Sequence, residues 1–272
     1  MSFRWSQRHR AFLSAAVGHR EPGRADIKEN IKNAWLTDVP DVALKPEKML
    51  DVEFGYSFQS EKVGASVNVY LMEYWDMLLE TGKLSNVGYA IKENVDRGWR
   101  RGLELCASYE PLKWLRADAN ITLSSNKIRD YKEYVQNVDT YDNWAMTGRT
   151  TMYEYGNSTM LMSPPVTGMM KLTFIPWKKA AVSIDGKYVG MQYLDNTMTL
   201  SRSIPSYFVS NLSVSHTFDL NRGSLGLALY VNNLFNNMYY ADGWCWKNII
   251  EEDGALVDGI GIYPQAPVNY ML

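Results

Sequence analysis

Residues 115–123 read LRADANITL, and this stretch decides the fold class of the chain. Successive side chains of a β-strand point to opposite faces, so one face of this strand carries only Leu, Ala and Ile. The other face carries Arg, Asp, Asn and Thr, and residues 224–232, SLGLALYVN, repeat the alternation. In a soluble β-sandwich such an apolar face covers a core, whereas in a transmembrane barrel it faces lipid and the polar face lines the lumen.

The same pattern recurs from end to end and predicts about ten antiparallel strands. Their connections alternate between short turns, such as residues 59–61 and 110–113, and long polar segments. The long segments are expected at about residues 19–46, 76–96, 126–163, 194–203 and 237–262. Large aromatic residues mark the places where strands meet short turns: Phe58, Tyr109, Trp114, Phe174, Trp177 and Phe218. Together these features favour an all-β, antiparallel transmembrane β-barrel with short periplasmic turns, an aromatic belt and long extracellular loops.

Composition argues against several other classes of protein. The net charge of −2 gives no support for nucleic-acid binding. No apolar run reaches the roughly 18 residues of a transmembrane helix. The mean hydropathy of −0.30 suits membrane strands, because polar lumen residues offset lipid-facing ones in an average. Cys106 lies in mid-strand and Cys245 in a late loop, so the two are expected to be far apart and unbridged, and residues 1–20 do not have the pattern of a signal peptide.

Residues 231–236, VNNLFN, and residues 101–105, RGLEL, are the most specific motifs of the chain. Further stretches of the same kind are residues 19–26, 86–110, 120–128, 187–196, 229–240 and 263–271. Together they resemble the C-terminal half of a TonB-dependent outer-membrane receptor, most closely the Bacteroidetes branch. The resemblance implies a barrel of about 22 strands around an N-terminal plug. It also implies active uptake of an iron–siderophore complex, haem, cobalamin or another large scarce nutrient, energised by TonB through a short TonB box.

The chain departs from this family pattern in three respects. It has about ten predicted strands, it contains neither plug nor TonB box, and its last strand stops at Leu272, before the usual terminal aromatic residue. We therefore expect residues 1–272 to be one partial receptor barrel domain, a fragment. Its expected partners are outer-membrane lipid, a missing N-terminal plug and barrel half, the TonB complex through that missing part, and a siderophore-like ligand. Open sheet edges in lipid cost several kcal/mol per unpaired group, so the fragment alone is expected to fold poorly.

Two sets of residues are candidates for function. Aromatic residues in the 126–163 segment could bind a ligand together with the loop at 244–246, and the alternative is a surface segment packed on itself. The ligand-binding candidates are Tyr131, Tyr134, Tyr141, Trp144, Arg149, Tyr153, Trp244 and Trp246. The candidates on the lumen or plug-facing side are Glu104, Arg116, Asp118, Asn120, Lys171 and Lys187. For this second set, contact with plug or water is favoured over contact with substrate.

No catalytic motif is recognisable in the sequence. His9, His19 and His216 are dispersed, no Cys-x-x-Cys or phosphate-binding loop occurs, and the carboxylates show no pairing suited to acid–base chemistry. We therefore expect neither an enzyme nor a bound metal or cofactor. Two classes remain: a transport receptor in the outer membrane and, as the alternative, a soluble all-β carbohydrate-binding protein with exposed Trp and Tyr. A requirement for detergent would distinguish the receptor from the soluble protein.

Overall fold

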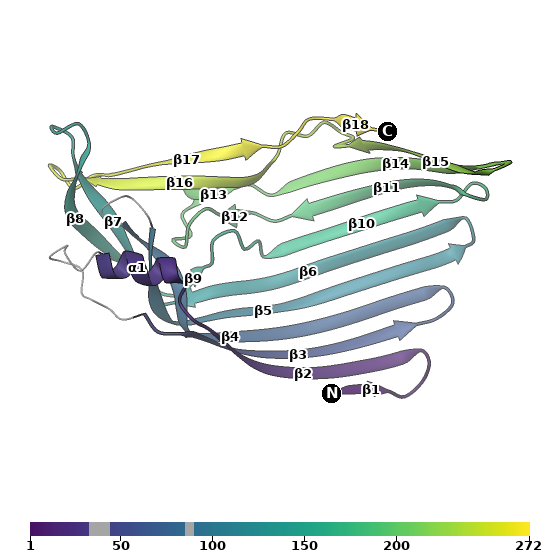
Figure 1. The fold of residues 1–272 in the computed structure, drawn as a ribbon, viewed down its shortest axis with the longest axis horizontal. Helices are drawn as coiled ribbons and strands as arrows, with labels where there is room; N and C mark the ends of the chain where they lie inside the picture. The colour runs from purple at the N-terminus through teal and green to yellow at the C-terminus, as the bar shows by residue number, and fades with distance from the viewer. Residues whose placement is uncertain (33–43, 85–89) are drawn as a thin grey trace.

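The computed structural model describes residues 1–32, 44–84 and 90–272, and most of them form one antiparallel sheet (Figure 1). Its strands lie in the order β1-β2-β3-β4-β5-β6-β10-β11-β14-β15-β18. Their bounds are β1 Ser2–Arg4, β2 His9–Arg20, β3 Glu47–Gln59, β4 Val63–Leu84, β5 Ala90–Leu112, β6 Leu115–Arg129, β10 Val166–Phe174, β11 Ala180–Val189, β14 Tyr207–Leu220, β15 Gly223–Asn232 and β18 Asn269–Met271. The edge strands β1 and β18 are not paired with each other within the described residues, so the sheet is open there.

The register keeps like residues opposite each other across the sheet. Between β6 and β10, Leu115 pairs with Phe174, while Asp118 pairs with Lys171. Because side chains alternate with a period of two, a slip of one residue would move every apolar side chain to the polar face. The alternation recognised at residues 115–123 therefore specifies a common apolar face and a common polar face for the whole sheet.

The apolar face of the sheet is uncovered. Leu13 on β2 is 51% exposed, Ile121 on β6 is 39% exposed and Leu227 on β15 is 46% exposed. In a soluble sandwich these side chains would be buried against a second sheet. Their exposure contradicts the alternative of a soluble carbohydrate-binding protein. An uncovered apolar face is instead the arrangement expected of strands that contact lipid.

Two details of the predicted strand pattern are corrected by the structure. The chain turns at residues 5–8, so its first stretch, which the alternating pattern predicts as one strand, is a hairpin of β1 and β2, and the path has eleven strands where about ten are predicted. The described parts of three long connections, 76–96, 126–163 and 237–262, are also mostly strands rather than irregular loops. Much of the segment expected as a loop at 76–96 belongs to β4 and β5, which stay paired from Met77 with Val95 to Glu80 with Lys92. Pairing of these strand extensions satisfies the backbone N–H and C=O groups, which in a loop would have to hydrogen-bond with water.

Strands within the long connections form a second sheet at one end of the molecule. Its order is β17-β16-β7-β8, with bounds β7 Lys132–Asp139, β8 Ala145–Glu154, β16 Tyr240–Ile250 and β17 Leu256–Pro264. β16 runs parallel to β7, with Asn248 opposite Gln136. Two short pairings lie nearby, β12 Gln192–Tyr193 with β13 Ser203–Ile204, and β9 Ser158–Thr159 with β6. We refer to this end as the long-connection end and to the opposite end as the short-turn end (Figure 1).

The buried apolar core lies at the long-connection end rather than between layers of the main sheet. Met77, Ile128, Tyr131 and Met160 form its centre, and Tyr155 packs against it. The helix α1, Arg24–Lys32, lies at this end too (Figure 1). Among the described residues no helix is long and apolar enough to cross a membrane.

Candidate functional site

Tyr131 and Tyr134, at and after the start of the β7–β8 hairpin, are the first of the predicted ligand residues. Tyr131 is buried, its hydroxyl donates to the carbonyl oxygen of Glu80 at 3.2 Å, and its ring lies 6.1 Å from that of Tyr155. Tyr134 is partly buried on β7, whose backbone packs so closely on the end of β4 that a Cβ at Gly82 would lie 2.3 Å from the Tyr134 carbonyl oxygen. Tyr131 therefore supports the β7–β8 hairpin from inside the core.

Other predicted ligand residues lie farther along the same hairpin. Tyr141 and Trp144 are exposed at its tip, where Trp144 has a positive φ of 63°. Arg149 forms an ion pair with Glu251 at 2.7 Å, which connects this hairpin to the end of β16. Tyr153 is partly buried on β8, opposite Glu133 on β7. The hairpin thus presents two exposed aromatic rings at its tip.

Trp244 and Trp246 form a pair on β16, which we call the aromatic ledge. They are 50% and 43% exposed and occupy alternate positions of the strand, so they share one face. Gly261 and Gly259 on β17 lie directly opposite them. A Cβ on Gly261 would lie 2.4 Å from Trp244 Nε1, and one on Gly259 would lie 2.7 Å from Trp246 Nε1. The two indole rings lie over the backbone of Gly259 and Gly261, and any side chain at these two positions would occupy the space that the rings fill.

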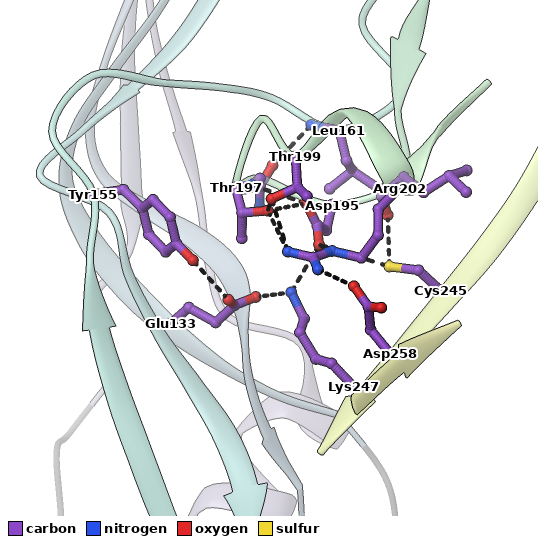
Figure 2. Close-up of polar contacts among 12 residues, drawn as sticks. Glu133, Tyr155, Leu161, Asp195, Thr197, Thr199, Arg202, Cys245, Lys247 and Asp258 are labelled. Atoms are coloured by element: carbon purple, nitrogen blue, oxygen red, sulfur yellow. Dashed lines mark hydrogen bonds and ion pairs between the residues drawn. The ribbon is translucent and has the colours of Figure 1, made fainter. Parts of the chain in front are cut away.

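The intervening residues of β16 point to the opposite face, into a buried cluster of charged side chains (Figure 2). We call this cluster the hub; its members are Glu133, Asp195, Arg202, Lys247 and Asp258. Arg202, whose side chain is only 4% exposed, follows the loop after β12, in the 3₁₀ helix η2 (Leu200–Arg202). Its Nε donates to Asp195 Oδ2 at 2.7 Å, and the guanidinium also forms an ion pair with Asp258 on β17.

Two threonines complete the environment of the Arg202 guanidinium. Its Nη2 donates to Thr197 Oγ1 and to Thr199 Oγ1, each at 2.9 Å. The hydroxyl of Thr197 in turn donates to Asp195 Oδ1 at 2.6 Å. All three Arg202 nitrogens therefore have acceptors, as burial of a guanidinium requires.

Lys247 connects the other half of the hub. Its Nζ donates to Asp195 Oδ2 at 2.7 Å and forms a second ion pair with Glu133. The hydroxyl of Tyr155 donates to Glu133 Oε2 at 3.3 Å. Lys247 and Asp195 are mostly buried and Glu133 is almost completely so. The hub thus ties β7, the loop from Asp195 to Arg202, β16 and β17 into one unit, and the ledge stands on the other face of that unit.

The hub also perturbs the ionisation of its members and neighbours. Burial would raise the pKa of Asp195, but hydrogen bonds from Lys247 and Thr197 outweigh it and bring the pKa to about 2. Burial and the nearby Asp195 carboxylate raise the pKa of the Cys245 thiol to about 11. Burial, together with Glu133, raises the pKa of Tyr155 to about 12. Asp195 therefore stays charged and Cys245 stays protonated at neutral pH, so the hub is suited to holding structure.

The six residues predicted for the lumen side share one face of the main sheet. Asp118 lies opposite Lys171, while Asn120 and Lys187 both lie opposite Met169. Glu104 accepts a hydrogen bond from Asn68 Nδ2 at 3.3 Å, and Arg116 donates to Asp118 at 2.9 Å. A recess of about 540 Å³ opens beside Asp118, Asn120 and Lys171. Whether a plug or water meets this face stays a prediction.

The hub itself was missed by sequence analysis. Only Asp195, Thr197, Thr199 and Arg202 lie close together in sequence, and they fall in a segment that carries no periodic pattern. The remaining charges come from β7, β16 and β17, which meet only in the folded chain. Cys106 and Cys245 are both free, as predicted. Among the described residues no group of three or more His, Cys, Asp or Glu side chains could hold a metal ion.

An antiparallel sheet with an exposed apolar face, short turns at one end and long, structured connections at the other defines an outer-membrane β-barrel. The family model described as TonB dependent receptor-like, beta-barrel matches residues 1–234, and the chain belongs to that family. This is a family of outer-membrane receptors rather than enzymes, so the chain is an outer-membrane protein. The predicted fold class and localisation are confirmed, and the Bacteroidetes assignment stays a prediction.

Solved structures of similar fold agree with this assignment. The ferric-catecholate import receptor Fiu from E. coli K12 has a TM-score of 0.61 and 13% identity over 99% of this chain and 33% of its own. The siderophore receptor PiuA from Acinetobacter baumannii has a TM-score of 0.70 and 14% identity over 99% and 34%. The ferric citrate transporter FecA has a TM-score of 0.67 and 18% identity over 98% and 35%. At these identities the likeness shows the fold alone, and the chain spans about a third of each structure. No curated protein matches the chain.

Proposed function

We propose that this chain is part of an outer-membrane receptor that actively takes up a large scarce nutrient with energy from TonB. An iron–siderophore complex is the favoured nutrient, with haem and cobalamin as the others to be tested. The family match over residues 1–234 supports receptor-type uptake. The likeness to receptors described as importing ferric catecholate and ferric citrate supports an iron complex. The plug, the other barrel strands and the TonB contact would come from sequence outside these 272 residues, as a partner or as part of a longer chain.

The observation that carries the ligand proposal is the aromatic ledge. Two exposed indoles lie side by side over glycine backbone, on a strand whose other face is fixed by Lys247 in the hub. A flat ring of a catecholate or corrinoid would stack on such a surface without ordering flexible side chains first. Tyr141, Trp144, Arg149 and Tyr153 on the neighbouring hairpin would supply further contacts, and the long-connection end would then face the outside of the cell.

The test is an uptake experiment in the source bacterium. A strain lacking the gene is complemented with the parent, with the double variant W244A/W246A, or with W244F/W246F, and uptake of a radioactive ferric catecholate and of ferric citrate is measured. Each stacked aromatic is worth roughly 0.5–1.5 kcal/mol, so the alanine variant, which removes two, should bind about fivefold to 150-fold more weakly, whereas the phenylalanine variant should keep most of the affinity. W114A/F174A removes a stacked pair of exposed aromatic rings from the short-turn end and serves as the matched control.

Dependence on TonB is tested in the same strain with a protonophore, which removes the proton gradient that energises TonB. The protonophore should stop uptake of the iron complex and leave its binding at the cell surface intact. Normal growth of the gene-deleted strain under iron limitation, together with no uptake defect for either iron complex, would exclude the iron proposal. Haem and cobalamin uptake would then be measured in the same strains.

A further inference from the structure

The short-turn end carries a positive charge that the rest of the chain does not. Five turns join the strands there: residues 5–8, 60–62, 113–114, 175–179 and 221–222 (Figure 1). Their charged residues are Arg8, Glu61, Lys62, Lys113, Lys178, Lys179 and Arg222. Six basic residues and one acidic residue give a formal charge of +5 in a chain of net charge −2, so the remaining residues carry −7. The charge of the protein is therefore strongly polarised along the strand direction.

An aromatic cluster lies beside the last two of these turns. The ring of His216 meets that of Phe218 edge-on at 4.4 Å and that of Trp177 at 6.1 Å. Trp177 and Phe218 are exposed, whereas His216 Nδ1 is buried without a hydrogen-bond partner. Lys179 forms an ion pair with Asp219, and for Arg222 no carboxylate partner is recorded among the described residues. A buried polar ring atom without a partner thus lies beside two exposed aromatic rings, and the adjacent turn at residues 221–222 carries a basic residue.

A second cluster of the same composition lies at the first turn. Trp5 stacks at 5.9 Å on His9 and at 6.0 Å on Tyr56, and His9 lies 5.1 Å from Phe58. His9 Nδ1 and the Tyr56 hydroxyl are hydrogen-bonded at 2.8 Å. Arg8, in the turn itself, supplies the positive charge. Tryptophan, histidine, phenylalanine and a basic turn residue therefore occur together twice, at opposite sides of the same end.

Both clusters belong to the apolar face of the main sheet. His216 lies opposite Leu227, and His9 lies opposite Phe58, which continues the apolar row of β3. This face meets lipid, so the clusters lie where the hydrocarbon region gives way to headgroups. Indole and imidazole rings suit that boundary because one part of each ring is apolar and another is polar. Basic residues just beyond the boundary attract anionic headgroups.

We propose that the short-turn end is a docking surface for anionic phospholipids of the inner, periplasmic leaflet. The phosphodiester of the headgroup lies against the basic turns, and the acyl chains lie along the exposed Trp177, Phe218 and Trp5 rings. Charge complementarity selects this occupant, because the turns are basic in a chain that is acidic elsewhere. Free phosphate would satisfy the charge and leave the apolar rings bare. The docking surface follows from the barrel fold and its orientation, and does not depend on which nutrient is taken up.

The test uses the receptor purified from the outer membrane of its source bacterium in a neutral detergent, titrated with dioleoyl-phosphatidylglycerol or with the zwitterionic dioleoyl-phosphatidylcholine and followed by native mass spectrometry. The turn variant K113Q/K178Q/R222Q removes three charges from three neighbouring turns. The control variant R24Q/K28Q/R129Q removes three exposed charges from the long-connection end. Heat-modifiable migration on gels confirms that each variant is folded.

The parent should bind phosphatidylglycerol more tightly than phosphatidylcholine. Each basic residue near an anionic surface is worth about fivefold in affinity, so the turn variant should lose between roughly tenfold and a hundredfold for phosphatidylglycerol and nothing for phosphatidylcholine. The control variant should change by less than about twofold. Equal affinity of the parent for both lipids, or an equal loss in both variants, would overturn the proposal. If the turn variant does not fold, the salt dependence of the parent provides the test. Its preference for phosphatidylglycerol must then fall steeply between about 50 mM and 500 mM salt, and a salt-independent preference refutes the charge mechanism.

Discussion

Replacing Asp195 by asparagine should loosen the long-connection end without unfolding the main sheet. Asp195 accepts from Arg202, Lys247 and Thr197, and asparagine keeps its size while removing its charge. The fall of the Asp195 pKa from 3.8 to about 2 measures how much its surroundings favour the charged form. That difference corresponds to roughly 2 kcal/mol, or between about tenfold and a hundredfold in an opening equilibrium.

Hydrogen exchange followed by mass spectrometry is the appropriate assay, because it reports local opening segment by segment. In D195N, amides of residues 194–203 and of β16 should exchange at least about tenfold faster, whereas those of β5 and β6 should not change. The control D142N removes an exposed carboxylate from the tip of the β7–β8 hairpin and should leave all segments as they are. Protection of residues 194–203 within twofold of the parent, or an equal effect of D142N, would refute the view that Asp195 holds the hub together.

Three further predictions concern the same end of the molecule. The Asp195 pKa is depressed, so the charged form of Asp195 stabilises the fold fully above about pH 4, and this effect is lost as the pH falls through about 2. Hydrogen exchange of residues 194–203, corrected for the intrinsic rate, should therefore accelerate between these pH values in the parent. In D195N it should not change over the same range. In the C106S background, Cys245 should react with iodoacetamide about a hundredfold more slowly in the folded chain than in denaturant at pH 7.5, since its pKa is raised from 9.0 to about 11. Equal rates would contradict its burial beside Asp195. I128A should lower the free energy of unfolding by about 2–5 kcal/mol in urea titrations, because Ile128 is fully buried, while I27A on the exposed side of α1 should change it little.

The main sheet could be predicted because its determinants are local. The alternation at residues 115–123 and 224–232 is visible in each strand by itself, and it correctly predicts the two faces of the sheet. The turn at Trp5–Arg8 was missed because it contains neither glycine nor proline, the residues that usually mark a turn. The strands β7, β8, β16 and β17 were expected as loops because their polar and aromatic residues occupy both faces. A strand outside the membrane contacts no lipid, so neither of its faces has to be apolar.

Part of the candidate site could likewise be predicted from the sequence, and part depends on the folded structure. Trp244 and Trp246 could be named from sequence as exposed aromatic residues, but their side-by-side position over Gly259 and Gly261 depends on the pairing of β16 with β17. Tyr131 has the same chemistry as the other candidates, and only its position among Met77, Ile128 and Met160 makes it a core residue.

By itself, then, the sequence determined that this chain forms antiparallel strands with one lipid-facing side and an aromatic short-turn end. Those properties follow from the period of two along each strand and from residues adjacent in the chain. The tertiary structure alone decided that Glu133, Asp195, Arg202, Lys247 and Asp258 meet in one buried hub. Four of these side chains are mostly buried, with Asp258 at the exposed edge, and burial of charges is tolerable only when each has an opposite charge at contact distance. That condition depends on strands far apart in the sequence.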